Sequence, residues 1–295
     1  MAKAAQKSSE NLECCPNCTH SQYLYHASAY GVAAEIERPI KQSIHSQAAT
    51  VLPTGGGRGS ERAEKVRVPP FVSFDAAYSE VGGSFDACHN IHTTYASAVI
   101  EGLNVFDVVT ADRVVSRMVI YAYGRNGDEG EAGYDITGSH FDNLRIAGHP
   151  VDVKLPTSDI HKHENYSSFE AVIWSKQGQQ FLPWGDKSAQ EIKELEKQYH
   201  ALSGLGNRAS KWGEGKKPGQ AYRAAAGGKP EMSNPGLTCF GNIVLVPKFG
   251  IVRLAELIIH RNFRYLTMFH VQMCSGALGG AGGGGAGGSG GMGYP

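Results

Sequence analysis

The sequence has few charged residues and no excess of either sign, which argues against several classes of protein. Charged residues make up 19% of the 295, and 28 Lys and Arg balance 28 Asp and Glu. A chain without net charge has no long-range field to attract a phosphate backbone. We therefore expect no nucleic acid among its partners.

Long apolar runs are also missing. A membrane-spanning helix needs roughly 20 consecutive apolar residues, whereas the apolar runs here are only a few residues long. The opening residues, MAKAAQKSSENLECC, are polar where a secretory signal peptide would carry its apolar segment. We expect no membrane span and no signal peptide, and the sequence leaves the compartment open.

Recognisable catalytic motifs are lacking as well. The glycine-rich stretch at 54–59 does not end in the Gly-Lys-Ser/Thr of a phosphate-binding loop, and neither G-x-S-x-G nor H-E-x-x-H occurs. Asp112 is the one carboxylate that merits examination, although an Asp at the start of a strand more often completes a turn. We lean against an enzyme.

The best metal candidate lies near the N-terminus and comprises Cys14, Cys15, Cys18 and His20. Thiolates two residues apart can bind one tetrahedral zinc ion, and His20 could add a nitrogen ligand. A structural zinc site needs four ligands, and the alternatives are a mobile reduced segment or an intermolecular disulfide cluster. Zinc is therefore the only candidate cofactor.

Other potential ligands are more scattered. His161 and His163 share one face if extended, but a solvated loop is the simpler interpretation, and Cys88-His89 is not expected to combine with His92. Residues 124–131 form an acidic loop that misses the calcium-loop spacing. Several tyrosines could line a sugar-binding face, although tyrosines at strand spacing also pack cores and edges: Tyr23, Tyr25, Tyr30, Tyr78, Tyr95, Tyr121 and Tyr123.

The chain is rich in short segments typical of β-strands. Val, Ile, Tyr, Phe and Thr concentrate in 24–37, 71–81, 93–105, 112–124, 239–246, 250–260 and 264–273. Residues 141–155 predict a hairpin that turns at 147–150. The last three segments predict an antiparallel meander whose middle strand, around 254–259, is central and covered on both faces.

Two segments differ from this pattern. Residues 189–203 predict one amphipathic helix, capped by Ser188 with Glu191 and stopped by Gly204, followed by a basic loop at 205–236. The last 20 residues contain 12 of the 38 glycines and predict a flexible tail. A second possibility is that this tail becomes ordered only between neighbouring subunits, by pairing as a strand.

The predicted organisation has five parts. They are a flexible Cys-containing segment (1–20), the first part of a β domain (21–156), a helix and basic loop insertion (157–236), a C-terminal β meander that completes the core (237–275), and a Gly-rich tail (276–295).

Three segments together resemble a known family: SAYG at 28–31, VIEGLNVFDVVTADRVVSR at 99–117, and GSHFDNLRIAGHPVDV at 138–153. Their order and content are similar to the bacterial choice-of-anchor P proteins, which are β-rich extracellular proteins of unassigned activity. The resemblance implies a β scaffold and a cell-surface location. It transfers no active-site residue.

We therefore predict a mainly β protein, an antiparallel β-sandwich with one helix-and-loop insertion and low-complexity termini. The leading functional hypothesis is a non-catalytic structural protein that self-associates, as a filament, coat or surface subunit, through sheet edges and termini. The alternatives are a metal-binding module or metal-dependent enzyme that uses the Cys and His groups, and a carbohydrate-binding β module.

Overall fold

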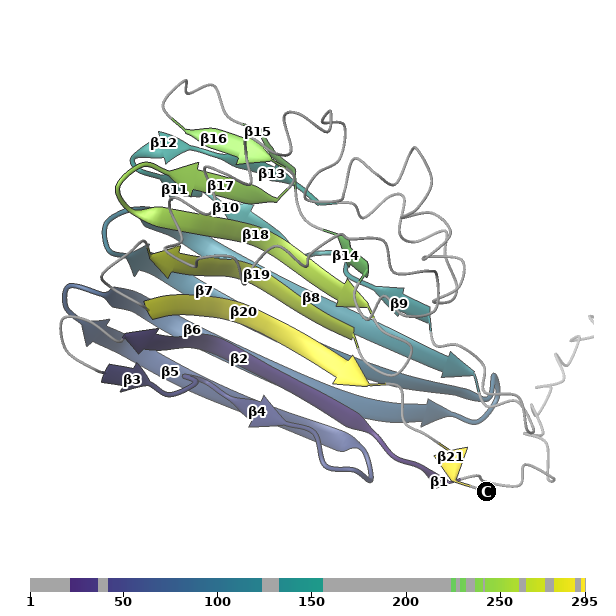
Figure 1. Ribbon diagram of the computed structural model, residues 1–295. Coiled ribbons are helices and arrows are strands. Elements are labelled where there is room, and N and C mark those ends of the chain that lie inside the picture. Colours follow the sequence, from purple (N-terminus) through teal and green to yellow (C-terminus); the bar gives the residue numbers. More distant parts are fainter. Residues whose placement is uncertain are drawn as a thin grey trace, which may run out of the picture.

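The computed structural model describes residues 22–36, 42–123, 133–155, 224–226, 229–231, 237–240, 242–259, 264–273, 279–289 and 293–294. In this part the chain is mainly β, and the pairing between strands is antiparallel, as the sequence predicts. Figure 1 shows the long strands in two stacked layers, an arrangement typical of a β-sandwich. The predicted helix at 189–203 and the N-terminal cysteines lie outside the described residues. So does most of the basic loop predicted at 205–236, but 224–226 and 229–231 within it are strands, which corrects the loop prediction there, because each pairs with a strand distant in sequence.

One layer, which we call sheet I, is built on a meander of four long strands. These are β5 (Gly57–Val68), β6 (Val72–Asp86), β7 (Ile91–Val105) and β8 (Val109–Tyr123). Beyond β8 lie β9 (Gly133–Asp135), β10 (His140–Asp142), β11 (Arg145–Ile146) and β12 (His149–Pro150). The sheet order is β12-β11-β8-β7-β6-β5, with β9 and β10 also paired to β8.

The other layer, sheet II, joins the two ends of the chain. Its order is β16 (Thr238–Phe240), β17 (Ile243–Val246), β18 (Gly250–Ile259), β19 (Arg264–Met273), β20 (Gly279–Ser289), β2 (His26–Ile36) and β3 (Gln42–Ile44). Two short strands, β4 (Thr50–Val51) and β14 (Ala224–Ala226), pair with β2 and β18. The predicted meander with β18 inside the sheet is confirmed.

Two small sheets complete the described strands. At one end of the sandwich, β1 (Gln22–Tyr23) pairs with β21 (Gly293–Tyr294). After the predicted hairpin, β13 (Asp152–Lys154) pairs with β15 (Lys229–Glu231). The hairpin itself turns on Ala147 and Gly148, whose φ angles of 51° and 79° suit a two-residue turn, so the turn is tighter than the sequence predicts.

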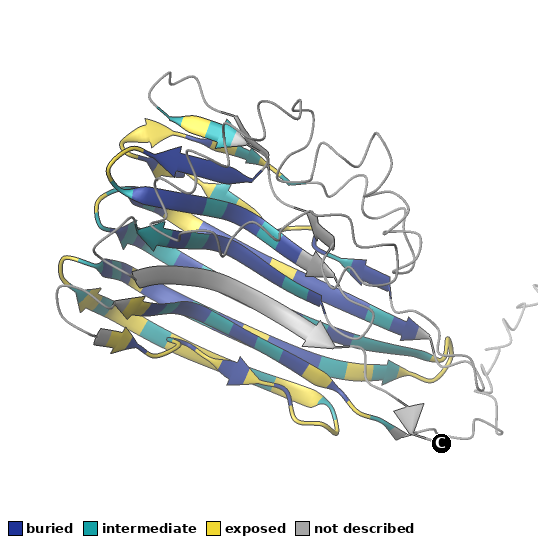
Figure 2. Cartoon of the chain, in the orientation of Figure 1, coloured by how far each residue is buried: buried dark blue, intermediate teal, exposed yellow. Residues whose placement is uncertain are grey.

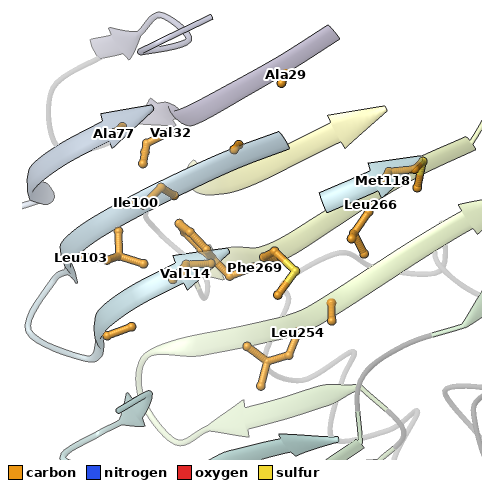
Figure 3. Close-up of a cluster of buried hydrophobic side chains, with 14 of the residues drawn as sticks. Ala29, Val32, Ala77, Ile100, Leu103, Val114, Met118, Leu254, Leu266 and Phe269 are labelled. Atoms are coloured by element: carbon orange, nitrogen blue, oxygen red, sulfur yellow. The ribbon is translucent and has the colours of Figure 1, made fainter. Parts of the chain in front are cut away.

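The inner faces of the two sheets form one core. Side chains from the N-terminal strands, such as Phe74 and Ile100, and from the C-terminal meander, such as Leu266 and Phe269, are each at most 1% exposed. Figure 2 shows the buried positions along the strands, and Figure 3 shows side chains of both sheets meeting. Each such side chain contributes roughly 1.5 to 3 kcal/mol through burial. The C-terminal meander therefore completes the core of the N-terminal strands, as predicted.

Along each long strand of sheet I, side chains alternate between the core and the outer face, and this alternation reverses at one row of residues that crosses the sheet. We call this row the crease. The register places Lys65, Asp75, Gly102, Asp112 and Asn143 in this row. Lys65, Gly102 and Asn143 have positive φ angles of 53°, 64° and 51°. The register is unchanged on either side, so the crease is not a bulge with an extra residue. Each strand reverses there which of its side chains face the core, and the pairing with its neighbours continues in the same register on both sides of the row.

The consequence on sheet I is that two successive residues point outward on each strand. On β7, for example, Ile100 and Leu103 are buried in the core, while Glu101 and Gly102 between them are only partly buried. Sheet II inverts in the opposite sense at Ala255, whose φ is 50°, and at Met268 beside it. There, two successive residues point inward, and Met268 and Phe269 are both fully buried. Sheet II therefore places an extra side chain in the core at its inversion, whereas sheet I places one fewer there at its own.

The Gly-rich tail corrects one prediction. Residues 279–289 were expected to be flexible or to become ordered only between subunits, yet they form β20 inside sheet II of the same chain. The physical reason is that β2 and β19 each present a row of backbone donors and acceptors to this segment. Those hydrogen bonds offset the loss of backbone entropy on ordering, which the few side chains of this segment could not offset by burial.

Candidate functional site

The most unusual element of sheet II is β20, because it is almost without side chains. Eight of its eleven residues are glycine. It lies between β19 and β2, in register with eight residues of one and ten of the other. Gly283, for example, pairs with Phe269 on one side and Val32 on the other, both of which are fully buried. We call the space that β20 fills the slot between β2 and β19.

The chemistry of this slot is main-chain recognition. Backbone N–H and C=O groups on both flanking strands must be paired in the interior of a sheet, and β20 supplies their partners. With so few side chains, little besides hydrogen bonding holds β20 in one register. The slot therefore recognises an extended backbone rather than a particular side-chain sequence.

A pair of tyrosines closes over β20. Tyr30 on β2 and Tyr265 on β19 come from strands on opposite sides of β20, and their hydroxyl oxygens are 2.5 Å apart. Alternation puts both on the outer face, since Ala29 and Leu266 beside them are in the core. Burial raises the pKa of Tyr265, and the neighbouring Tyr30 hydroxyl raises it further. The Tyr265 hydroxyl therefore stays protonated near neutral pH.

The outer face of sheet I carries two tyrosines held in different ways. The Arg62 guanidinium stacks 4.7 Å from the centre of the Tyr78 ring. Tyr95 lies over Gly82, where a β-carbon would overlap its ring, and its hydroxyl donates a 2.6 Å hydrogen bond to Glu80. Burial raises the pKa of Tyr95, as does the bond to Glu80. Both rings are fixed by neighbouring strands of the same sheet.

The tyrosines predicted as a possible sugar-binding face do not gather on one surface. Tyr78, Tyr95, Tyr121 and Tyr123 lie on strands of sheet I, and Tyr30 lies on sheet II. Tyr23 and Tyr25 pack instead around His92 at the end of the sandwich. The structure therefore separates these rings into three places.

The environment of His92 is aromatic. Its ring stacks on Tyr23 at a centroid distance of 3.9 Å and on Phe85 at 4.4 Å, and Nδ1 is hydrogen-bonded to the Tyr25 hydroxyl at 2.9 Å. Burial lowers the pKa of His92 and raises that of Tyr25, so both are neutral at pH 7. This cluster holds β1 against the ends of β6 and β7. Sequence spacing gave no signal of it, because its rings come from distant segments.

Asp112, the carboxylate singled out from the sequence, has a structural role in the crease. The side-chain amide of Asn143 donates a 2.6 Å hydrogen bond to it. In the same row, the Asp75 carboxylate occupies the space above Gly102 and lies 3.5 Å from Arg67. These contacts fix the crease across neighbouring strands. Asp112 lies inside β8 and not at the start of a strand, so the role in a turn expected from the sequence is corrected.

The remaining metal candidates are not brought together. His89 lies in the turn between β6 and β7 and contacts Asp86 at 2.7 Å, whereas His92 faces the aromatic cluster, so they do not share a site. The hydrogen bonds from His89 lower the pKa of Asp86. Within the described residues, no group of three or more His, Cys, Asp or Glu side chains could hold a metal ion. Cys14, Cys15, Cys18, His20, His161, His163 and the 124–131 loop lie outside those residues, and zinc binding stays a prediction.

The fold and its surfaces define an antiparallel β-sandwich with matched creases and a glycine strand inside one sheet. Residues 23–260 match the family described as a domain of unknown function (DUF8256), and the chain belongs to that family. Comparison with curated proteins found no match, and neither did comparison with solved structures. In the part of the chain that the structure describes, no helix is long and apolar enough to cross a membrane.

Proposed function

We propose that this chain is a non-catalytic structural protein that self-associates, as a subunit of a filament, coat or surface layer. The observation that carries the proposal is β20, an interior strand held almost entirely by its backbone. Main-chain hydrogen bonds of this kind supply the affinity when strands pair between subunits in strand-addition assemblies. The resemblance to choice-of-anchor P proteins supports a cell-surface location as part of this proposal.

The rest of the sandwich supports a mechanical role. Strands of 15 residues on sheet I span roughly 50 Å at the usual rise per residue. The paired creases keep the core filled along this length, which favours a stiff slab. We do not advance the carbohydrate-binding alternative, because Tyr23 and Tyr25 pack around His92 and the Tyr78 ring is stacked by Arg62.

The test is the oligomeric state of the purified full chain. Light scattering coupled to size-exclusion chromatography, over a wide range of protein concentration, is expected to show mass rising with concentration. Negative-stain electron microscopy is expected to show regular assemblies in the concentrated sample. A protein that stays monomeric at the highest concentration would contradict the proposal.

A further inference from the structure

We propose that β20 is exchanged between copies of the chain, so that the slot between β2 and β19 of one copy is filled by β20 of another. The inference rests on the proposed function, because it specifies how self-association occurs. The partner is a second copy of this chain, and the recognised element is its residues 279–289.

The topology of sheet II makes the exchange possible. β20 follows β19 directly in the chain, while its other neighbour, β2, is separated from it by the whole of sheet I and the meander. Withdrawing β20 leaves β17, β18 and β19 paired to each other on one side and β2 paired to β3 and β4 on the other. What remains is a space one strand wide with unpaired backbone on both sides. Another copy of β20 fits the same space with the same register.

Because β20 is mostly glycine, displacing it costs less free energy than displacing either neighbouring strand. Displacing β19 would pull Leu266 and Phe269 out of the core, and displacing β2 would remove Val32, all of which are fully buried. β20 contributes chiefly main-chain hydrogen bonds, and these are identical whichever copy supplies them. The own-chain strand is favoured only by its high local concentration, so exchange should grow with protein concentration.

The tyrosine pair controls this exchange. The hydrogen bond between Tyr30 and Tyr265 spans β20, so the two rings must separate before the strand can leave or enter on that face. Once β20 is seated, the same bond closes over it again. The pair therefore acts as a clasp, and weakening it is expected to make exchange faster.

Disulfide trapping tests the exchange directly. Ser28 and Gly287 are paired in register between β2 and β20, so cysteines at these positions can form a disulfide. In a background with the six native cysteines replaced by serine, Ser28→Cys and Gly287→Cys chains with different affinity tags are co-expressed. The pair Val99→Cys and Val115→Cys, in register between β7 and β8, is the matched control, because those strands also carry core side chains.

The expected result is a disulfide-linked species containing both tags for the Ser28 and Gly287 pair and none for the control. Its amount is expected to rise with concentration. The bond between Tyr30 and Tyr265 forms equally in the own-chain and the exchanged arrangement, so Tyr265→Phe in both chains is expected to change not the final amount but the rate of cross-linking, which should rise by about fivefold, the factor equivalent to one neutral hydrogen bond. Tyr95→Phe, which loses its hydroxyl on the other sheet, should leave it unchanged.

A variant with both cysteines in one chain separates the remaining outcomes. If it forms an internal disulfide while the mixed chains never cross-link, β20 stays in its own chain and the exchange is wrong. If neither arrangement forms a disulfide, β20 does not pair with β2 and the exchange is also wrong. Oligomers of the unmodified chain without cross-links would leave the structural function standing, whereas a monomeric unmodified chain would remove it as well.

Discussion

Gly31 on β2 faces Ala77 on β6 across the core, so closely that a β-carbon built on Gly31 would lie 2.7 Å from the β-carbon of Ala77. The backbone amide of Gly31 also donates to the carbonyl of Gln47, so this part of β2 is held from two sides. Stacked sheets ordinarily lie about 10 Å apart, and only a position without a side chain allows this approach beside the crease.

We expect Gly31→Ala to lower the free energy of unfolding by about 1 to 3 kcal/mol, because the added methyl group overpacks the contact with Ala77. Urea unfolding followed by circular dichroism measures the change. Gly55→Ala is the control, since a β-carbon there meets nothing within 4 Å and should change stability little. Equal effects of the two substitutions would contradict the close approach of the sheets.

Lys65, a left-handed residue on the edge strand β5, gives a prediction in which glycine does not lower stability. Lys65 is exposed with a φ of 53°, and a left-handed non-glycine residue costs roughly 1 to 2 kcal/mol. Lys65→Gly removes this cost, partly offset by the greater backbone entropy of glycine. We expect stability to be unchanged or to rise by up to about 1 kcal/mol. Ser60→Gly, at an extended position of the same strand, should instead lower it by roughly 0.5 to 1 kcal/mol.

A double-mutant cycle tests the clasp over β20 independently of assembly. Tyr30→Phe and Tyr265→Phe should each lower the free energy of unfolding by about 1 kcal/mol, because each leaves the other hydroxyl without its partner. The double variant should lose clearly less than the sum of the two, since neither unsatisfied hydroxyl remains. Additive losses in thermal or urea unfolding would mean that the two hydroxyls do not interact in solution.

Acid should destabilise the sandwich through His270. Burial, followed by the neighbouring Arg253 guanidinium 3.3 Å away, lowers the pKa of His270 to about 4. Because the unfolded chain takes up this proton at about pH 6.5, the stabilising contribution is complete above that pH. It is lost as the pH falls from about 6.5 towards 4, by at most about 1.4 kcal/mol per unit.

The measurement is the urea unfolding free energy at pH 7 and pH 5. His270→Gln should show a smaller decline between the two than the unmodified chain, because it removes a group that resists protonation only when folded. His140→Gln replaces an exposed histidine and is the control. A decline as steep in His270→Gln as in the unmodified chain would show that another group is responsible.

Alternation of polar and apolar residues predicted the long strands well, and it failed where the crease reverses that alternation. The apolar run beginning at Leu254 was interpreted as a strand covered on both faces. In the structure, Leu254 and Ala255 both point into the core because the φ of Ala255 is positive. The two-residue alternation within one segment of sequence cannot reveal such a reversal, because the reversal occurs together with that of the neighbouring strands in the same row.

Two of the longer strands were missed for different physical reasons. β5 carries charge along most of its length, so its composition resembles a solvated loop, and only its pairing with β6 identifies it. β20 has almost no side chains, and its structure is decided by the backbones of β2 and β19. Its partner β2 lies at the other end of the sequence, which no local pattern reports. Asp112, expected to begin a strand and complete a turn, lies inside β8, and its hydrogen bond joins it to Asn143, 31 residues further along the chain, which no local pattern predicts.

The edge strand β5 has a further consequence for how copies of this protein behave when crowded. Cross-β fibrils grow from flat, uncharged edges that accept a neighbouring strand along their whole length. β5 alternates Arg58, Glu61, Arg62, Glu64 and Arg67, and the left-handed Lys65 interrupts its straight run of donors and acceptors. These features disfavour pairing of densely packed copies along β5, so amyloid growth from this edge is not expected even at high protein concentration.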